Sequence, residues 1–97
     1  MKIEWTPLAI QRLPEIANNI SYDKPEVAKK FIFEIFDKVK KITQFAEIGR
    51  IVPEIKRDEI RELFHKNYRI IYRNTDKKIF ILTIRHCRQI LTEKDIK

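Results

Sequence analysis

Three apolar runs separated by short polar breaks fill residues 59–88, and this stretch constrains the fold more than any other part of the chain. The runs are rich in isoleucine, leucine, phenylalanine and tyrosine, and polar residues at 74–77 separate the last two. Such alternation over short segments is typical of an antiparallel strand–turn–strand meander. We therefore expect three consecutive antiparallel strands in the C-terminal half.

The arginines of these runs share a parity that places them on one face of the predicted sheet. Side chains alternate between the two faces of a strand, so Arg69 lies opposite Tyr68 and Tyr72. If the tyrosines fill the core, the other face is exposed and cationic, and it carries Arg61, Arg69, Arg73 and Arg85, with His86 and Arg88 at the rim. Guanidinium groups suit phosphate and carboxylate, so this face is expected to meet an anion. The alternative is that Arg61 and Arg69 pair with neighbouring glutamates at 54, 59 and 62.

The N-terminal half predicts a short strand and a first helix. Residues 1–5 alternate between apolar and polar side chains, as a strand does. Thr6 and Pro7 are typical of a helix start, with Thr6 as the N-cap and Pro7 in the first helical position. Apolar residues then recur at helical spacing as far as Ile20. Pro14 interrupts this helix and predicts a kink or break over residues 10–14.

A second helix is predicted to follow a turn at 21–24. Pro25 opens it, and the apolar stripe that runs from Val27 to Ile42 has Phe36 at its centre. The short connection makes the two helices an antiparallel hairpin on one side of the sheet. Residues 44–56 show no period and read as a loop, in which Gly49 is expected to adopt a positive φ.

Composition limits the classes of protein that the chain can belong to. Its 97 residues, 43% of them hydrophobic, predict one folded domain over 1–97. The single cysteine excludes an internal disulfide and a multi-cysteine metal site, and no cofactor is expected. No apolar run approaches the roughly 20 residues of a membrane span, and no signal-peptide pattern is present, so we expect a cytoplasmic protein that binds no membrane.

Positive charge is concentrated in the half that holds the meander. The formal net charge is +7. Residues 1–48 carry 8 basic and 7 acidic side chains, a net charge of +1, whereas residues 49–97 carry 13 and 7, a net charge of +6. This excess favours an acidic partner at the meander, either nucleic acid or protein.

Five short motifs occur in the order found in a known family of toxins. They read W-T-P-x-A at 5–9, G-R-x-V-P-E at 49–54, I-R-E-L at 60–63, Y-R-I-I-Y at 68–72 and I-R-H-x-R at 84–88. Together they resemble the RelE/ParE superfamily, whose members belong to type II toxin–antitoxin pairs. The resemblance covers essentially the whole chain. It implies an α+β fold with an N-terminal strand and an antiparallel helical hairpin packed on one face of an antiparallel meander sheet.

The resemblance leaves more than one target open. RelE-like members cut mRNA on the ribosome, and in them the arginine at the position of Arg69 contacts the scissile phosphate. On that reading the catalytic residues would be Arg69, Arg85, His86 and Arg88. ParE-like members instead poison DNA gyrase and are not enzymes. Residues 89–97 lack the tyrosine or histidine that the nucleases often place there, which favours a ParE-like toxin. A nucleic-acid-binding domain, or a decayed toxin that binds only its antitoxin, is the third hypothesis.

The partners and the target-binding residues follow from the same resemblance. We expect an acidic antitoxin that forms a hetero-oligomer with this chain. Its amphipathic segment is predicted to lie on the helical hairpin and to reach the sheet edge near Arg61, Arg69 and Arg85. The remaining target-contacting candidates are basic residues of the loop and the meander, namely Arg50, Lys56, Arg57, Arg61 and Arg73.

Overall fold

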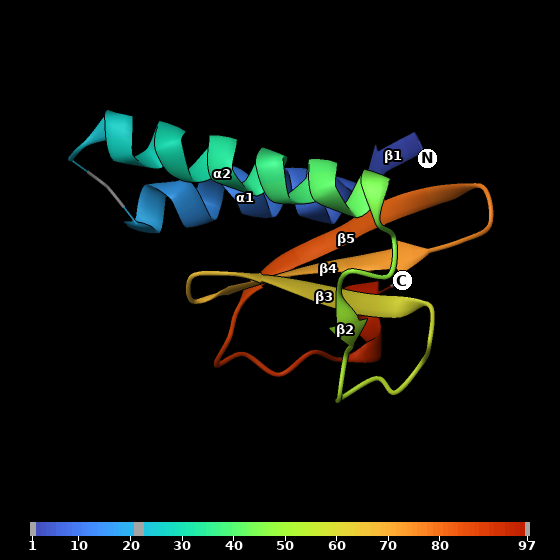
Figure 1. Ribbon diagram of the computed structural model, residues 1–97. Coiled ribbons are helices and arrows are strands. Elements are labelled where there is room, and N and C mark those ends of the chain that lie inside the picture. Colours follow the sequence, from blue (N-terminus) through green and yellow to red (C-terminus); the bar gives the residue numbers. More distant parts are fainter. Residues whose placement is uncertain (1, 21–22, 97) are drawn as a thin grey trace.

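The chain folds as two helices packed on one face of a five-stranded sheet (Figure 1). The computed structural model describes residues 2–20 and 23–96. The strands are β1 (Lys2–Trp5), β2 (Arg50–Ile51), β3 (Ile60–His65), β4 (Tyr68–Asn74) and β5 (Lys78–His86), and the helices are α1 (Pro7–Ile20), α2 (Pro25–Gln44) and the 3₁₀ helix η1 (Glu93–Ile96). The α+β class, the hairpin and the antiparallel β3–β4–β5 meander are confirmed. The predicted turn at 21–24 has its first two residues outside the described part of the chain.

Two features of the sheet differ from the prediction. The strand order is β1-β5-β4-β3-β2, and β1 pairs with β5 in parallel, so the sheet is mixed. The segment expected to be a structured loop contributes β2, which pairs with β3 through two residue pairs. Both additions lie at edges of the sheet, where a strand of two to four residues can pair on one side.

Thr6 joins the first strand, the first helix and the last strand. Its hydroxyl oxygen accepts a hydrogen bond from the Ala9 N–H at 3.2 Å, which confirms the predicted N-cap. The same hydroxyl donates to the Leu82 carbonyl at 2.8 Å. Of the kink or break predicted over residues 10–14, a break is excluded, because α1 continues through Pro14. Pro14 and the 61%-exposed Ile10 lie on the solvent side, where water can satisfy the carbonyl that a proline leaves unbonded.

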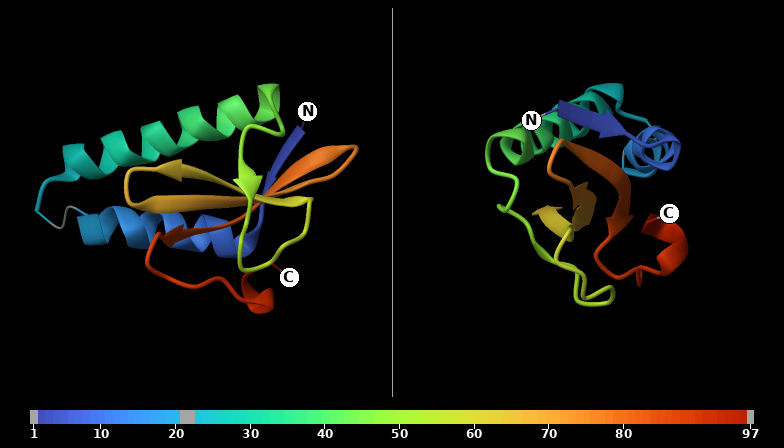
Figure 2. Two further views of the ribbon diagram at one scale, coloured as in Figure 1. Left: turned by 60° about the horizontal axis from the view of Figure 1, so that its bottom comes forward. Right: turned by 90° about the vertical axis from the view of Figure 1, so that its right-hand side faces the viewer.

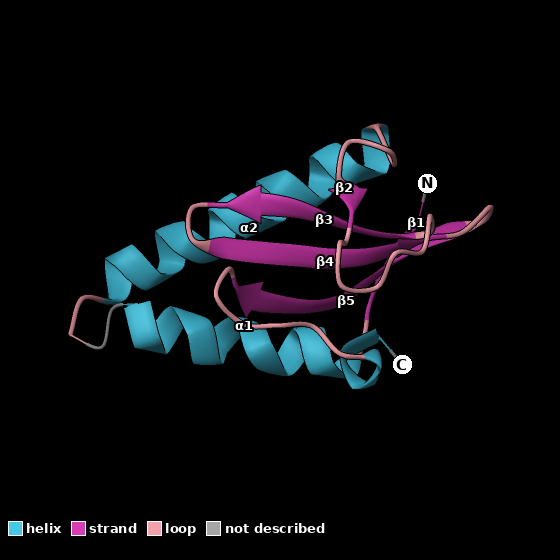
Figure 3. Ribbon diagram, turned by 90° about the horizontal axis from the view of Figure 1, so that it is seen from below, coloured by secondary structure: helices cyan, strands magenta, loops and turns pink. Residues whose placement is uncertain are grey.

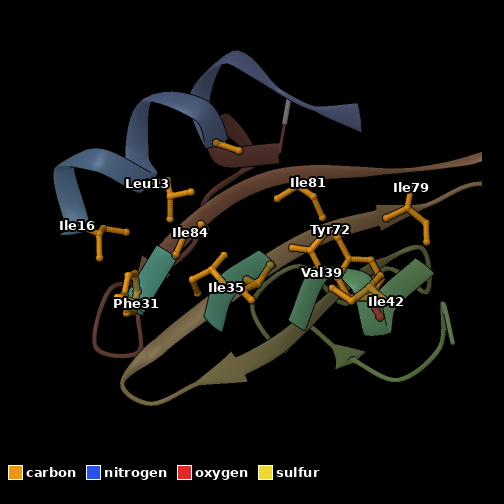
Figure 4. Close-up of a cluster of buried hydrophobic side chains, with 12 residues drawn as sticks. Leu13, Ile16, Phe31, Ile35, Val39, Ile42, Tyr72, Ile79, Ile81 and Ile84 are labelled. Carbon is orange, nitrogen blue, oxygen red and sulfur yellow. The ribbon is translucent and has the colours of Figure 1, made fainter. Parts of the chain in front are cut away.

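The principal core lies between the hairpin and the sheet (Figure 4). From α2 it buries Phe31, Ile35, Val39 and Ile42, which recur at helical spacing. The placement of Phe36 at the centre of this stripe is wrong. Its side chain is 45% exposed at the edge of the helix and contacts the Trp5 ring edge-on, with the centroids 5.5 Å apart.

Tyr72 lies at the end of this core that is next to residues 46–49. It is fully buried, as predicted, and its hydroxyl donates to the Ala46 carbonyl at 2.8 Å and accepts from the Gly49 N–H at 2.9 Å. Gly49 does not have a positive φ. A Cβ there would lie 2.6 Å from the Glu62 carbonyl oxygen and 2.7 Å from the Tyr72 hydroxyl, so glycine is required for space rather than for backbone conformation.

A second core covers the opposite face of the sheet. The loop that follows β2 and the tail that follows β5 cross this face (Figures 2 and 3). They bury apolar side chains from the loop, the strands and the tail: Val52, Ile60, Ile71, Leu82, Leu91 and Ile96. Leu82 lies on this side with Phe80, opposite Ile79 and Ile81, whereas Ile84 is back in the principal core. The register of β4 and β5 shifts between Ile71 and Tyr72, which interrupts the simple alternation of side chains along β5. In the described part of the chain, both faces of the sheet are therefore covered.

Candidate functional site

Arg69 lies beneath the loop and the tail, and the prediction that it is exposed is wrong. Only 5% of its side chain is accessible. Its Nε donates to Glu62 at 2.5 Å, and its two terminal nitrogens donate to the two carboxylate oxygens of Glu54 at 2.8 and 2.9 Å. One of those nitrogens also donates to the Gln89 carbonyl at 3.0 Å. A single guanidinium therefore holds β3, the loop and the tail together.

The two glutamates have further partners, so the network is well satisfied. The carboxylate of Glu62 is inaccessible and also accepts from the Nε of Arg50 at 2.6 Å. The Arg50 guanidinium lies over the Phe64 ring at 4.9 Å from its centroid. Glu54 accepts from the Leu91 N–H at 3.0 Å. Hydrogen bonds from Arg69 are the main reason that the pKa of Glu54 falls from 4.5 to about 2.

Two other arginines of the predicted cationic face hold the end of the tail. Arg85 donates to Asp95 at 2.6 Å, and Arg73 donates to the Ile96 carbonyl at 3.0 Å. Burial alone would raise the pKa of Asp95, but hydrogen bonds from the Thr92 backbone and Arg85 outweigh it and the pKa is lowered. The arginine face therefore does meet anionic groups, but these are carboxylates of the same chain.

Arg61 points to the other side of the sheet from Arg69. It shares its strand face with Leu63 and His65, which pack toward the helices. Its guanidinium donates to the Gly49 carbonyl at 3.0 Å and to Asp58 at 3.1 Å. The structure therefore brings together three of the four predicted arginines, and Arg61 instead holds the chain that enters β2.

The remaining basic candidates are accessible. Arg50, Lys56 and Arg57 are exposed on β2 and the following loop, and Arg88 is exposed on the tail. The loop and the tail lie side by side, because Arg57 approaches Glu93 at 3.9 Å and Glu54 bonds to Leu91. We call this group of four exposed residues, Arg50, Lys56, Arg57 and Arg88, the basic rim. These are the sequence-predicted basic residues that the structure leaves exposed.

His86 lies at the end of β5, partly buried against the edge of the Tyr68 ring, with the ring centroids 5.3 Å apart. Its Nδ1 accepts from the Arg88 N–H at 3.1 Å. His86 is paired with Tyr68, whose side chain packs on the hairpin side of the sheet, whereas Arg69 faces the loop and the tail. Among residues 2–20 and 23–96, no group of three or more metal-ligating side chains is found. No described helix is long and apolar enough to cross a membrane.

Sequence reasoning missed the acidic half of this network. Glu54 and Glu62 were considered only as exposed partners of the arginines, and Asp95 was not considered at all. Glu62 carried a signal, because strand alternation places it on the same face as Ile60 and hence on a buried face. Glu54 and Asp95 lie in segments without a period, so their positions carried no comparable signal.

Comparisons with known proteins now decide the family. The model of the "ParE toxin of type II toxin-antitoxin system, parDE" family matches residues 3–91. The chain belongs to the ParE toxin family. It is therefore a toxin of a type II toxin–antitoxin system.

One solved structure agrees with this assignment, and a second shows the same fold. A chain of the chromosomal ParDE toxin–antitoxin system from P. aeruginosa is 28% identical, with a TM-score of 0.73 over 89% of this chain and 95% of that one. A chain of the RelBE2 toxin–antitoxin complex from Mycobacterium tuberculosis is 17% identical, with a TM-score of 0.56 over 88% and 95%, and shares the fold. No curated protein matches the chain.

Proposed function

We propose that this ParE-family toxin inhibits growth by binding DNA gyrase through a protein–protein contact, without cutting RNA. The proposal rests on one observation, namely that the arginine face is buried and already paired with carboxylates of the same chain. The arginine that would hold a scissile phosphate, Arg69, is buried and bonded to Glu54 and Glu62. A phosphate would have to displace these two carboxylates together with the loop and strand that carry them. Any carboxylate that stayed in place would repel the phosphate, because both are negatively charged.

The basic rim is the surface proposed to contact the target. Its residues are exposed and lie on β2, on the loop that follows it and on the tail. The loop and the tail cover the sheet on the side away from the hairpin (Figure 2). An exposed cationic surface accelerates association with an acidic partner and orients it. The rim also leaves the hairpin free for a different partner, so target and antitoxin can occupy separate faces.

Two assays on the purified toxin separate gyrase inhibition from ribosome-dependent cleavage. We expect the toxin to inhibit gyrase-catalysed supercoiling and to leave mRNA on translating ribosomes uncut in primer extension. Lys56→Ala combined with Arg88→Ala should weaken inhibition, whereas Lys40→Ala on the exposed face of α2 is the matched control. Specific cuts in mRNA with unaffected supercoiling would reverse the assignment. If neither activity appears in a folded protein, the chain retains antitoxin binding alone.

The antitoxin is proposed to bind the hairpin. An apolar groove of about 380 Å³ is lined by Trp5, Ile10, Leu13, Pro14, Ile32 and Phe36. Phe36 also belongs to a stripe of exposed residues that runs along α2 at helical spacing and consists of Lys29, Phe33, Phe36 and Lys40. Aromatic rings between two lysines suit an amphipathic segment with acidic residues around its apolar face. This matches the acidic antitoxin expected from the sequence.

Charge introduced into the groove tests the antitoxin site. Ile10→Asp should weaken binding of the cognate antitoxin by about tenfold or more in calorimetry, because an anchoring apolar contact is lost. Phe45→Asp is the control, since Phe45 is also exposed but lies outside the groove, at the C-terminal end of α2. Equal affinities of the two variants would place the antitoxin elsewhere.

A further inference from the structure

The tail that follows β5 presents Ile90 to solvent at a point where the backbone is fixed. With 74% of its side chain accessible, Ile90 is the most exposed large hydrophobic residue in the described part of the chain. The Gln89 carbonyl accepts a hydrogen bond from a terminal nitrogen of Arg69 at 3.0 Å, and the Leu91 N–H donates to Glu54 at 3.0 Å. The backbone groups on each side of Ile90 are therefore bonded to the buried network.

The turn that leads into Ile90 is held by further bonds. The Gln89 N–H donates to the His86 carbonyl at 3.0 Å, and the Gln89 side-chain oxygen accepts from the His86 N–H at 3.0 Å. The Nδ1 atom of His86 also accepts from the Arg88 N–H at 3.1 Å. Beyond the turn, Leu91 is buried in the second core. Ile90 therefore projects from a rigid part of the tail rather than from a loose chain end.

A second branch of the network fixes an arginine and an aromatic ring at the surface. Glu62 accepts from Arg69 through one carboxylate oxygen and from Arg50 through the other, at 2.5 and 2.6 Å. The Arg50 guanidinium lies over the Phe64 ring, 4.9 Å from its centroid. The Arg50 side chain is nevertheless 60% exposed, and Phe64 is 39% exposed. Arg50 is bonded through Nε, and within residues 2–20 and 23–96 its two terminal nitrogens have no hydrogen-bond partner.

Both branches reach the surface on the same side of the sheet. Arg50 and Glu62 are register partners of the β2–β3 pair and so share a face, and strand alternation places Phe64 on that face too. The loop and the tail cross the same face (Figure 3). The guanidinium of Arg69 is bonded to both branches. We call Arg50, Phe64 and Ile90 the docking surface.

The composition of the docking surface is typical of a contact with a protein. Single exposed apolar side chains are common and have no meaning alone. Here an isoleucine, a phenylalanine and an arginine are held in place before any partner arrives, which lowers the entropic cost of binding. Arginine and aromatic residues are also enriched among the residues that dominate binding energies. Interfaces with nucleic acid are more polar and rely on phosphate contacts, which an isoleucine cannot make.

We propose that the docking surface anchors the toxin on its target protein, with Ile90 in an apolar pocket and Arg50 paired with a carboxylate at the edge of that pocket. The inference rests on the proposed function for the identity of this protein, gyrase. Two exposed cations of the basic rim, Lys56 and Arg88, favour an acidic surface around the pocket. The buried network of Arg69 then has a positioning role, because it fixes the anchor without touching the target.

Growth arrest on induction tests the docking surface without assuming the target. Ile90→Asp should raise the amount of soluble toxin that halves the growth rate by about tenfold or more, because an anchoring apolar contact is replaced by a charge. Phe45→Asp is the matched control, since Phe45 is exposed but lies outside the docking surface, at the end of α2. Both variants should keep the urea midpoint of the parent, because both side chains are exposed. Equal behaviour of Ile90→Asp and the parent, including no arrest by either, would overturn the proposal.

Two milder variants distinguish a protein partner from nucleic acid. A protein pocket is sensitive to both Ile90→Ala and Arg88→Ala, whereas a phosphate backbone is sensitive to Arg88→Ala alone. Loss of growth arrest in Arg88→Ala with full arrest in Ile90→Ala would therefore overturn the proposal.

Gyrase supercoiling, measured on the same purified proteins, reports separately on the proposed function. A parent that arrests growth but leaves supercoiling unaffected would refute gyrase as the target. The docking surface would still stand if Ile90→Asp abolished that arrest.

Backbone ¹⁵N relaxation tests the positioning role of the network. In the parent, the Ile90 amide should be as rigid as the strands, with an order parameter of about 0.85. Glu54→Ala should lower this value, because the Leu91 N–H loses its acceptor. An order parameter below about 0.6 in the parent, or one that Glu54→Ala leaves unchanged, would overturn the positioning role.

Discussion

Replacing Arg69 by alanine should lower the free energy of unfolding by about 3–5 kcal/mol, the usual cost of removing one member of a buried charge network. The variant leaves the carboxylate of Glu62, which has no solvent access, with Arg50 as its remaining ion-pair partner. Arg50 is itself 60% exposed, so it compensates the charge weakly. Glu54 retains the Leu91 N–H and is partly accessible, so it contributes less to the loss.

Urea denaturation at neutral pH, followed by circular dichroism, measures this loss. Arg57→Ala is the control, because Arg57 forms an exposed pair with Glu59 and such pairs contribute about 0–1 kcal/mol. Adding Glu62→Gln to the Arg69 variant should recover part of the stability, since the unpaired charge is then removed. A loss in Arg69→Ala no larger than that in Arg57→Ala would refute the assignment of Arg69 as a structural residue.

Three further changes test other parts of the fold. Tyr72→Phe should cost about 1–3 kcal/mol in chemical denaturation, because the buried Gly49 N–H loses its acceptor; an unchanged midpoint would contradict this. Ile35→Ala should cost about 2–5 kcal/mol and Phe36→Ala clearly less, because Ile35 is fully buried and Phe36 is not; the reverse order would show that the core is misplaced. The pKa of Glu54 is depressed by folding, so its contribution is present above pH 4.5 and is lost as the pH falls toward about 2. Unfolding midpoints measured across that window should fall less steeply in Glu54→Gln than in the parent, and parallel curves would argue against the role of Glu54.

Local patterns predicted the elements that depend on nearby residues. Thr6 and Pro7 mark the start of α1, and the period of the second helix gives the buried residues Phe31 and Ile35. The alternation of the meander places Tyr68 and Tyr72 toward the hairpin. These predictions succeed because capping, helical period and strand alternation are each determined over a few residues.

The network around Arg69 could not be derived in the same way. Its partners Glu54 and Gln89 lie 15 and 20 residues away, in segments without a regular period. Gly49 was misread because a lone glycine does not distinguish a positive φ from a close approach of neighbouring atoms. The exposed position of Arg69 followed from the assumption that one sheet face is open, and only the course of the loop and tail shows that it is covered.

The pairing of β1 with β5 has a consequence for when the toxin can finish folding. The bonds from Thr6 to Ile81 and Leu82 join residues separated by about three quarters of the chain. During synthesis, β1 therefore has no strand partner until residues 78–82 have left the ribosome, by which time both helices and most of the meander are already made. Chains that end at residue 77 should be degraded by protease faster than chains that extend to residue 97, and equal resistance would show that β5 is not needed to complete the fold. A chain made in this order completes its sheet only late in translation, because the contact between its first and last strands spans most of its length.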